Sequence, residues 1–279
     1  MILIADSGST KTDWCLIDPE GEERYFMTEG YNPFFSEPAS ILNSIRNNLP
    51  AYLQHTDIKA LHFYGAGCQD EQTAVIESIL REAFPQCETI EAEMDLLAAA
   101  RGLLNHNAGF AAILGTGTNT CIYDGKNITH NIDSLGFILG DEGSGAAIGK
   151  KILVDYLRDK MPQSVKRVFE AQYGLNAAAI INRIYTSPQA NRFCAGFTRF
   201  LKSDEVDAAY SNNLLRTAFT EFFSQLVSCY PDYRQYQFNC IGSVAYHFQT
   251  QLREVLDDFK MKPGCILSSL IRELANYHK

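Results

Sequence analysis

Small and hydroxyl-bearing residues are concentrated in two tight turns of this sequence, and each turn directly follows an apolar run. The first turn comprises Asp6, Ser7, Gly8, Ser9, Thr10, Lys11 and Thr12, and the second comprises Gly115, Thr116, Gly117, Thr118 and Asn119. A phosphate group is bound well by several backbone N–H groups and hydroxyls when the side chains are small enough for the backbone to approach. Two such turns predict a site that holds a polyphosphate from both sides, although either turn alone is common in hairpins.

The two turns also supply a candidate metal ligand. Asp6, the first residue of the first turn, is expected to hold Mg²⁺ through water, because this ion gives up its water reluctantly. The six histidines are scattered and none belongs to a His-Glu-x-x-His motif, so a zinc site has little support. The candidate phosphate ligands are Gly8, Ser9, Thr10, Lys11, Gly115, Thr116, Gly117 and Thr118.

A third glycine-rich loop, Gly-Asp-Glu-Gly-Ser-Gly, precedes a predicted helix that starts at Ala146. The start of a helix is a ready site for an anion or a hydroxyl group. The segment fails as a Walker loop because Ser144 replaces a glycine and Lys151 replaces the Ser or Thr. It also lacks Gly-x-Gly-x-x-Gly, since position 148 is Ile.

A fourth element places Gly242 and Ser243 between a predicted strand and a predicted helix. Such a junction could accept the flat face of a nucleoside. The alternative is a tight turn with only a structural purpose, and the residues alone do not decide between the two.

The elements around these loops alternate between strands and helices. The first 30 residues predict three strands joined by turns, residues 37–53 predict a helix, and a strand, a helix, a second strand and a second helix follow up to about residue 104. The pattern of hairpin and strand then begins again near Gly109, with Cys15 and Cys121 in corresponding places. The repeat predicts an α/β protein of two related domains, 1–104 and 105–266, that face a cleft.

Composition restricts the partners and the compartment. The net charge of −9, from 24 basic and 33 acidic residues, argues against nucleic acid as a partner. No apolar run approaches the roughly 18 to 20 residues of a membrane span, and no signal peptide is evident. The eight cysteines include no Cys-x-x-Cys and are expected to be reduced, which favours a cytoplasmic protein.

Taken together, the four elements resemble the actin/hsp70/sugar-kinase superfamily. Asp-Ser-Gly-Ser-Thr-Lys-Thr-Asp-Trp is similar to its first phosphate loop, Gly-Thr-Gly-Thr-Asn to its second, and Gly-Ser-Val-Ala to its adenosine loop. Gly-Asp-Glu-Gly-Ser-Gly resembles the group that contains N-acetylglucosamine kinase and the BadF/BadG/BcrA/BcrD-type ATPases, and the likeness to N-acetylglucosamine kinase is closer. The resemblance implies two ribonuclease-H-like domains of the actin-like ATPase type with an interdomain cleft, and a terminal helix, 267–279, that returns to the first domain.

The same resemblance implies an activity and a set of site residues. ATP and Mg²⁺ would serve a kinase that phosphorylates the primary hydroxyl of an amino sugar, with N-acetylglucosamine or a related N-acetylhexosamine expected, in a homodimer. Asp95 resembles the catalytic aspartate and would accept the hydroxyl proton, although an aspartate at a helix start is by default a cap. Asn32 resembles the asparagine of the sugar-binding loop, although Asn-Pro is also a turn signal. The other candidate sugar ligands are Asn119, Gly136 and Asp141.

One departure and two alternatives accompany this interpretation. Related kinases often carry a tryptophan before the Gly-Asp-Glu-Gly loop, whereas this chain has Ser134, Leu135, Gly136 and Phe137. One alternative is an ATPase that activates a dehydratase or reductase, but those relatives hold an iron–sulfur cluster with paired cysteines that are not evident here. The other is a sugar-sensing repressor, which would need a DNA-reading segment before Asp6.

Overall fold

The computed structural model describes residues 1–8, 10–34 and 36–279, which form two compact units. The first unit contains residues 1–108, 123–128 and 269–279, and the second contains residues 109–122 and 129–268. Among the described helices, none combines the length and apolar character that crossing a lipid bilayer requires.

The first unit is built on a five-stranded sheet in the order β3-β2-β1-β4-β5. The strands β1, β2 and β3 form antiparallel hairpins, whereas β1, β4 and β5 run parallel. Its strands are β1 (Ile2–Ser7), β2 (Lys11–Ile17), β3 (Glu23–Glu29), β4 (Ala60–Gly65) and β5 (Thr89–Met94). Its helices are α1 (Pro38–Asn48), η1 (Ala51–His55), α2 (Glu71–Ala83), α3 (Asp95–Leu104) and α12 (Ile271–Tyr277).

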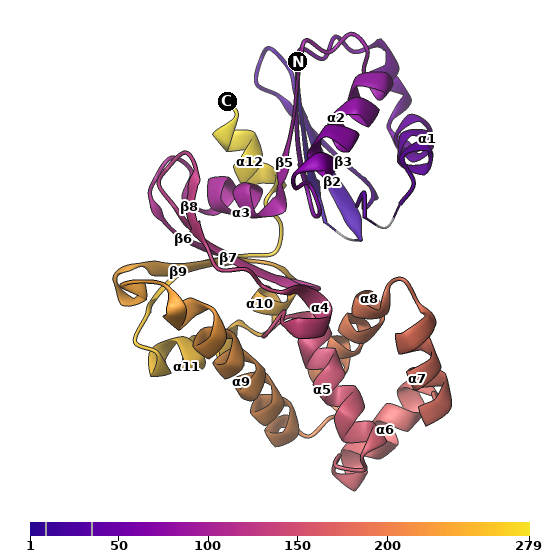
Figure 1. Cartoon of the computed structure of the whole chain (residues 1–279), viewed down its shortest axis with the longest axis vertical. Helices are drawn as coiled ribbons and strands as arrows, with labels where there is room; N and C mark the ends of the chain where they lie inside the picture. Colours follow the sequence, from indigo (N-terminus) through magenta and orange to yellow (C-terminus); the bar gives the residue numbers. More distant parts are fainter. Residues whose placement is uncertain (9, 35) are drawn as a thin grey trace. The chain divides into compact units, whose positions relative to one another are not determined.

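Burial explains why these segments take this form. β1 is central in the sheet, and its Leu3, Ile4 and Ala5 are fully buried. α2 buries Ile76, Ile79 and Leu80, which share one face at helical spacing. α12 packs on α3, β1 and β2 (Figure 1).

The helix predicted over residues 37–53 ends earlier than expected. α1 stops at Asn48, Leu49 is extended, and a 3₁₀ turn follows from Ala51. Pro50 causes the break, because a proline disfavours the helical conformation in the residue before it.

The second unit contains a sheet in the order β10-β9-β6-β7-β8. Read from its other edge, this order repeats that of the first sheet, with a hairpin of β6 and β7 corresponding to β1 and β2. Its strands are β6 (Gly109–Leu114), β7 (Thr118–Tyr123), β8 (Ile128–Asn131), β9 (Gln237–Ile241) and β10 (Lys262–Leu267). The internal repeat predicted from the two turns is therefore present in the strand order.

Helices make up most of the second unit between β8 and β9. They are α4 (Gly136–Leu139), α5 (Gly145–Leu157), α6 (Gln163–Tyr173), α7 (Ala177–Thr186), α8 (Ala190–Ala195), η2 (Gly196–Lys202), α9 (Ala208–Gln225), η3 (Val227–Cys229) and η4 (Tyr233–Gln235), and α10 (Ser243–His247) and α11 (Gln249–Asp258) follow β9. The core of this unit is rich in aromatic rings from β6, α9 and β9, including Phe110, Phe222 and Phe238.

Candidate active site

Two aspartates lie at one edge of the first sheet. Asp6 is near the end of β1, and Asp95 begins α3 directly after β5. Since Ser7, Gly65 and Met94 lie in one row across the parallel strands, the carboxyl ends of β1, β4 and β5 meet at this edge. The first unit therefore brings together two residues that are 89 positions apart in the sequence.

The surroundings of these aspartates disfavour their charged forms. Burial, with added repulsion from Asp13 and Asp95, raises the pKa of Asp6 to about 7, and Lys11 acts in the opposite direction. Burial also raises the pKa of Asp95 to about 6, although backbone N–H groups at the start of α3 lower it. Both residues keep partial access to solvent, so a carboxylate near its pKa at neutral pH remains within reach of a ligand.

Asp95 lies at the start of α3. Met94 occupies the N-cap position and makes no side-chain cap, while Asp95 is the first helical residue. The backbone N–H groups of Asp95 and Leu96 act on its carboxylate, so Asp95 serves the start of the helix, as the capping alternative expected, from the first helical position. This contact is compatible with a second role for the same carboxylate.

The first turn joins Asp6 to a charged pair. In the β1–β2 register Asp6 faces Asp13, whose carboxylate accepts a 2.6 Å hydrogen bond from Lys11 Nζ. Gly8 N–H donates to Lys11 O at 3.0 Å and closes the turn, and Thr10 is exposed. Ser9, a predicted phosphate ligand, lies outside the described residues.

The donor set suits a magnesium ion that keeps most of its water better than a metal ion held only by protein ligands. Among the described residues, no group of three or more His, Cys, Asp or Glu side chains could hold a metal ion. A single carboxylate such as Asp6 fits Mg²⁺ that retains water and is shared with phosphate oxygens.

Asn32 is held near this edge by buried hydroxyls. Ser7 Oγ accepts from Tyr31 N–H at 3.0 Å and lies 2.8 Å from Thr12 Oγ1. Asn32 is 7% exposed, and its Oδ1 accepts from Phe34 N–H at 2.9 Å. The turn that Asn32-Pro33 predicted is thus present and is closed by Oδ1. Asn32 Nδ2 donates to no acceptor within the described part of the chain.

Gly67 and Cys68 connect Asn32 to Asp95. A Cβ at Gly67 would lie 2.8 Å from Asn32 Oδ1, and its φ of +88° also favours glycine. Burial raises the pKa of the Cys68 thiol to about 12, and among the neighbouring charges Asp95 adds most to this effect. Asn32 and Asp95 therefore belong to one neighbourhood of the first unit.

In the second unit, the second turn is bonded to the start of α5. Gly145 N–H donates to Gly115 O at 2.8 Å, Ala146 N–H donates to Thr116 O at 3.0 Å, and Ser144 Oγ accepts from Ala147 N–H at 3.1 Å. The expectation that this helix start is open to an anion is therefore wrong, because its first N–H groups are already bonded. The N–H groups of Thr116 and Gly117 donate to no acceptor among the described residues and remain for a ligand.

The carboxylate of Asp141 contacts the second turn. Its Oδ1 accepts from Thr118 N–H at 3.0 Å, and a Cβ at Gly117 would lie 3.2 Å from both carboxylate oxygens. Burial raises the pKa of Asp141, whereas the Thr118 N–H and the charge of Lys150 lower it. Gly117 is small so that the turn can lie against this carboxylate.

The other predicted residues of the second unit fall into two groups. Gly242 has φ +129°, and a Cβ there would lie 2.3 Å from Leu114 O and 3.0 Å from Gly115 N. Gly242 and Ser243, which begins α10, therefore adjoin the second turn. Asn119 instead uses Oδ1 to accept from Thr120 N–H and Asn131 Nδ2, each at 3.0 Å, and Gly136 begins α4 with open space beside it.

Two contributions were not predicted from the sequence. The Ser7–Thr12 hydroxyl pair fixes the Asn32 loop. The sequence offered a hint of this pair, because the two hydroxyl residues stand near the two ends of the first turn, next to apolar runs. Lys150 donates to Phe137 O at 2.5 Å beside Asp141, and no signal in the sequence separates it from Lys151.

No protein-family model matches the chain, and no curated protein matches it. Solved structures do match. One is a Porphyromonas gingivalis protein provisionally named N-acetylglucosamine kinase, with 40% identity, a TM-score of 0.92, and coverage of 100% of this chain and 98% of the other. A Chromobacterium violaceum protein of the same provisional name has 16% identity and a TM-score of 0.70, with coverage of 100% and 98%.

A more distant match is a ROK-family glucokinase from Streptomyces griseus in complex with glucose and AMPPNP. It has 15% identity, a TM-score of 0.57, and coverage of 99% of this chain and 97% of the other. These likenesses confirm the α/β fold with two ribonuclease-H-like domains of the actin-like ATPase type.

Proposed function

This chain belongs to the N-acetylglucosamine kinase family, and from that premise we propose that it transfers the γ-phosphoryl group of ATP to the primary hydroxyl of an amino sugar. N-acetylglucosamine or a related N-acetylhexosamine is the proposed acceptor. The observation that carries the proposal is the position of Asp95 beside Asp6 at the carboxyl edge of β1, β4 and β5.

Asp95 is the proposed general base. Its Oδ accepts the proton of the sugar hydroxyl while the hydroxyl oxygen bonds to the γ-phosphorus and the bond from that phosphorus to the ADP oxygen breaks. A base of this kind works best when its pKa is near the working pH. Burial, which raises the pKa of Asp95 to about 6, supports this role.

Two groups of residues are proposed to hold the nucleotide. Lys11 and the first turn would contact phosphates from the first unit, and the free N–H groups of Thr116 and Gly117 would do so from the second. Gly242 and Ser243 would accept the adenosine. Mg²⁺, when bound, neutralises phosphate charge, and Asp6 would hold it through water.

The acceptor sugar is proposed to bind polar groups that the wrong substrate would leave unpaired. Asn32 would donate from Nδ2, and Asp141 would accept from sugar hydroxyls. Asn119 and Gly136 complete the proposed set. The homodimer implied by the resemblance stays a prediction, and size-exclusion chromatography with light scattering tests it.

A coupled assay of ADP release across a panel of hexoses and N-acetylhexosamines tests the function. We expect one N-acetylhexosamine to raise ADP release strongly, and Asp95→Asn to lower that rate by about 10² to 10⁴-fold, the usual contribution of a general base. Release that no sugar raises would contradict the kinase, and iron bound to the purified protein would then favour the activating ATPase.

A further inference from the structure

The segment that carries two of the proposed sugar ligands has little support of its own. α4 is a single turn that follows Leu135 and begins at Gly136, both with positive φ, and it leads to Asp141, which also has positive φ. Its outer residues Ile138 and Leu139 are 85% and 76% exposed. Bonds from Gly140 N–H to Gly136 O and from Asp141 N–H to Ser134 O close the loop locally, at 2.8 and 2.9 Å.

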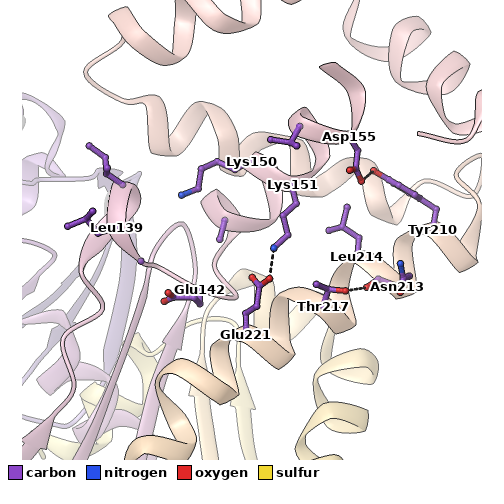
Figure 2. Close-up of a pocket in the computed structure, with 14 residues that line it drawn as sticks. Leu139, Glu142, Lys150, Lys151, Asp155, Tyr210, Asn213, Leu214, Thr217 and Glu221 are labelled. Atoms are coloured by element: carbon purple, nitrogen blue, oxygen red, sulfur yellow. Dashed lines mark hydrogen bonds and ion pairs between the residues drawn. The ribbon is translucent and has the colours of Figure 1, made fainter. Parts of the chain in front are cut away.

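The exposed side chains of α4 border an open cavity. The cavity has a volume of about 600 Å³ and lies among α4, α5 and α9, with Leu139, Glu142, Lys150 and Glu221 on its walls (Figure 2). An element that backs onto empty space can shift at small cost, since it gives up few contacts. The position of α4 therefore depends on few contacts, among them the packing of Phe137 against the core of the unit.

Lys150 of α5 makes another of these contacts. Its Nζ donates to Phe137 O at 2.5 Å and lies 4.7 Å from the centre of the Phe137 ring. The charge of the same ammonium also acts on the carboxylate of Asp141. One side chain thus touches the middle of α4 and stabilises the ionised form of the residue that follows it.

Helix α5, from which the Lys150 side chain extends, is firmly packed in the second unit. Ser144 caps α5, and the helix buries Ile148 and Ile152. It also packs so closely on α8 that a Cβ at Gly149 would lie 1.8 Å from Cys194 O. The backbone of Lys150 therefore has a fixed place relative to the second turn, which is bonded to the same helix.

Lys151 provides a matched comparison on the same helix. Its Nζ pairs with Glu221 of α9 at 2.7 Å. Figure 2 shows that the two lysines leave α5 in different directions, Lys151 toward Glu221 and Lys150 toward the turn that carries Leu139. The two side chains have the same chemistry and partial burial but different partners.

We propose that Lys150 is a positioning residue of the sugar site, which holds α4 where Gly136 and Asp141 meet the acceptor sugar. The proposal rests on the proposed function. It names the residue that sets the sugar side of the site, and it assigns Lys150 no contact with ATP.

Steady-state kinetics of Lys150→Met, Lys150→Arg and Lys151→Met test this role. Lys150→Met keeps the apolar stem but loses the donor, so we expect the sugar KM to rise about 5- to 30-fold, the factor that corresponds to one or two kcal/mol. The ATP KM should change by less than about twofold because the nucleotide residues are untouched. Lys150→Arg should restore most of the loss, and Lys151→Met should resemble the parent.

Amide hydrogen exchange of residues 134–141 gives a second readout that needs no turnover. Lys150→Met should speed this exchange and Lys151→Met should not, because local opening reports the stability of a segment. An unchanged sugar KM with unchanged exchange, or equal effects of the two methionine variants, would overturn the positioning role. If no sugar activates the parent protein but Lys150→Met still speeds the exchange, the proposed function is overturned and the contact of Lys150 with α4 is supported.

Discussion

At the scale of single residues, Asp95 shows a conflict between stability and function. Its folded pKa of about 6 lies above the ordinary value of 3.8 for an aspartate. The folded state therefore holds more protons than the unfolded state between these values. The stability that this group contributes is complete below about pH 4 and is lost as the pH rises through about 6.

Replacing the carboxylate should therefore stabilise the protein while it removes activity. We expect Asp95→Asn to raise the melting temperature at pH 7.5 by about 2 to 6 °C, the range for roughly one to two kcal/mol in a protein of this size. The gain should shrink at pH 5, where the parent carboxyl is largely protonated. Thermal unfolding at both pH values measures it, with Asp204→Asn as an exposed control.

The same carboxyl sets an acid limit on activity. Only the ionised base accepts a proton, so sugar-dependent kcat should fall as the pH is lowered through about 6. A rate that stays level down to pH 5 would contradict Asp95 as the base.

Single residues also mark the limit of prediction from the sequence. Asp95 could be predicted because it follows an apolar strand within a motif. Lys150 could not be separated from Lys151, since adjacent lysines on a helix look alike until the fold assigns each a partner. The raised pKa values likewise depend on burial that only the folded chain creates.

At the scale of elements, the repeated hairpin is the unit that could be predicted. Apolar runs that end in small-residue turns gave both hairpins, and the two sheets share one strand order. The bonds that place the turns could not be predicted. Gly145 and Ala146 donate to the second turn, and Ser7 holds Tyr31 from 24 positions away.

Gly242 tests how tightly the adenosine loop and the second turn are joined. Its φ of +129° and ψ of 158° belong to a region that only glycine occupies readily, and a Cβ would lie 2.3 Å from Leu114 O. We expect Gly242→Ala to lower the melting temperature by at least about 4 °C and to raise the ATP KM more than the sugar KM. Gly196→Ala is the control, because nothing lies within 4 Å of its Cβ position and its φ is negative. Equal effects of the two alanines would contradict this junction.

At the scale of the whole molecule, the chain returns to the first unit at its last helix. His278 stacks on His62 with ring centres 3.9 Å apart, and its Nε2 lies 2.8 Å from Tyr64 Oη. Arg101 of α3 donates to the same Tyr64 hydroxyl at 2.7 Å, and Glu91 of β5 faces His62 at 3.0 Å. Burial, together with His62 and Arg101, lowers the pKa of His278 to about 3.

This contact should make the first unit sensitive to acid. The unfolded histidine takes up a proton near pH 6.5, whereas folded His278 does so only near 3, so stability falls as the pH drops below about 6.5. Between pH 7.5 and pH 5, the melting temperature of His278→Gln should fall by less than that of the parent. His247→Gln, which changes an exposed histidine, is the control. Asp6 and Asp95 act in the opposite direction, but they are common to all three proteins. Equal losses in the parent and His278→Gln would contradict the prediction.

The return of α12 also fixes an order of events during synthesis on the ribosome. The second unit is complete at residue 268, whereas the first unit still lacks Leu270, Leu274 and Ala275, which are buried there. Domains generally fold from the amino-terminal end as they emerge, but here the earlier unit must wait for residues 269–279. Until then the apolar side of α3 around Gly102, where Leu270 belongs, is uncovered and open to chaperones.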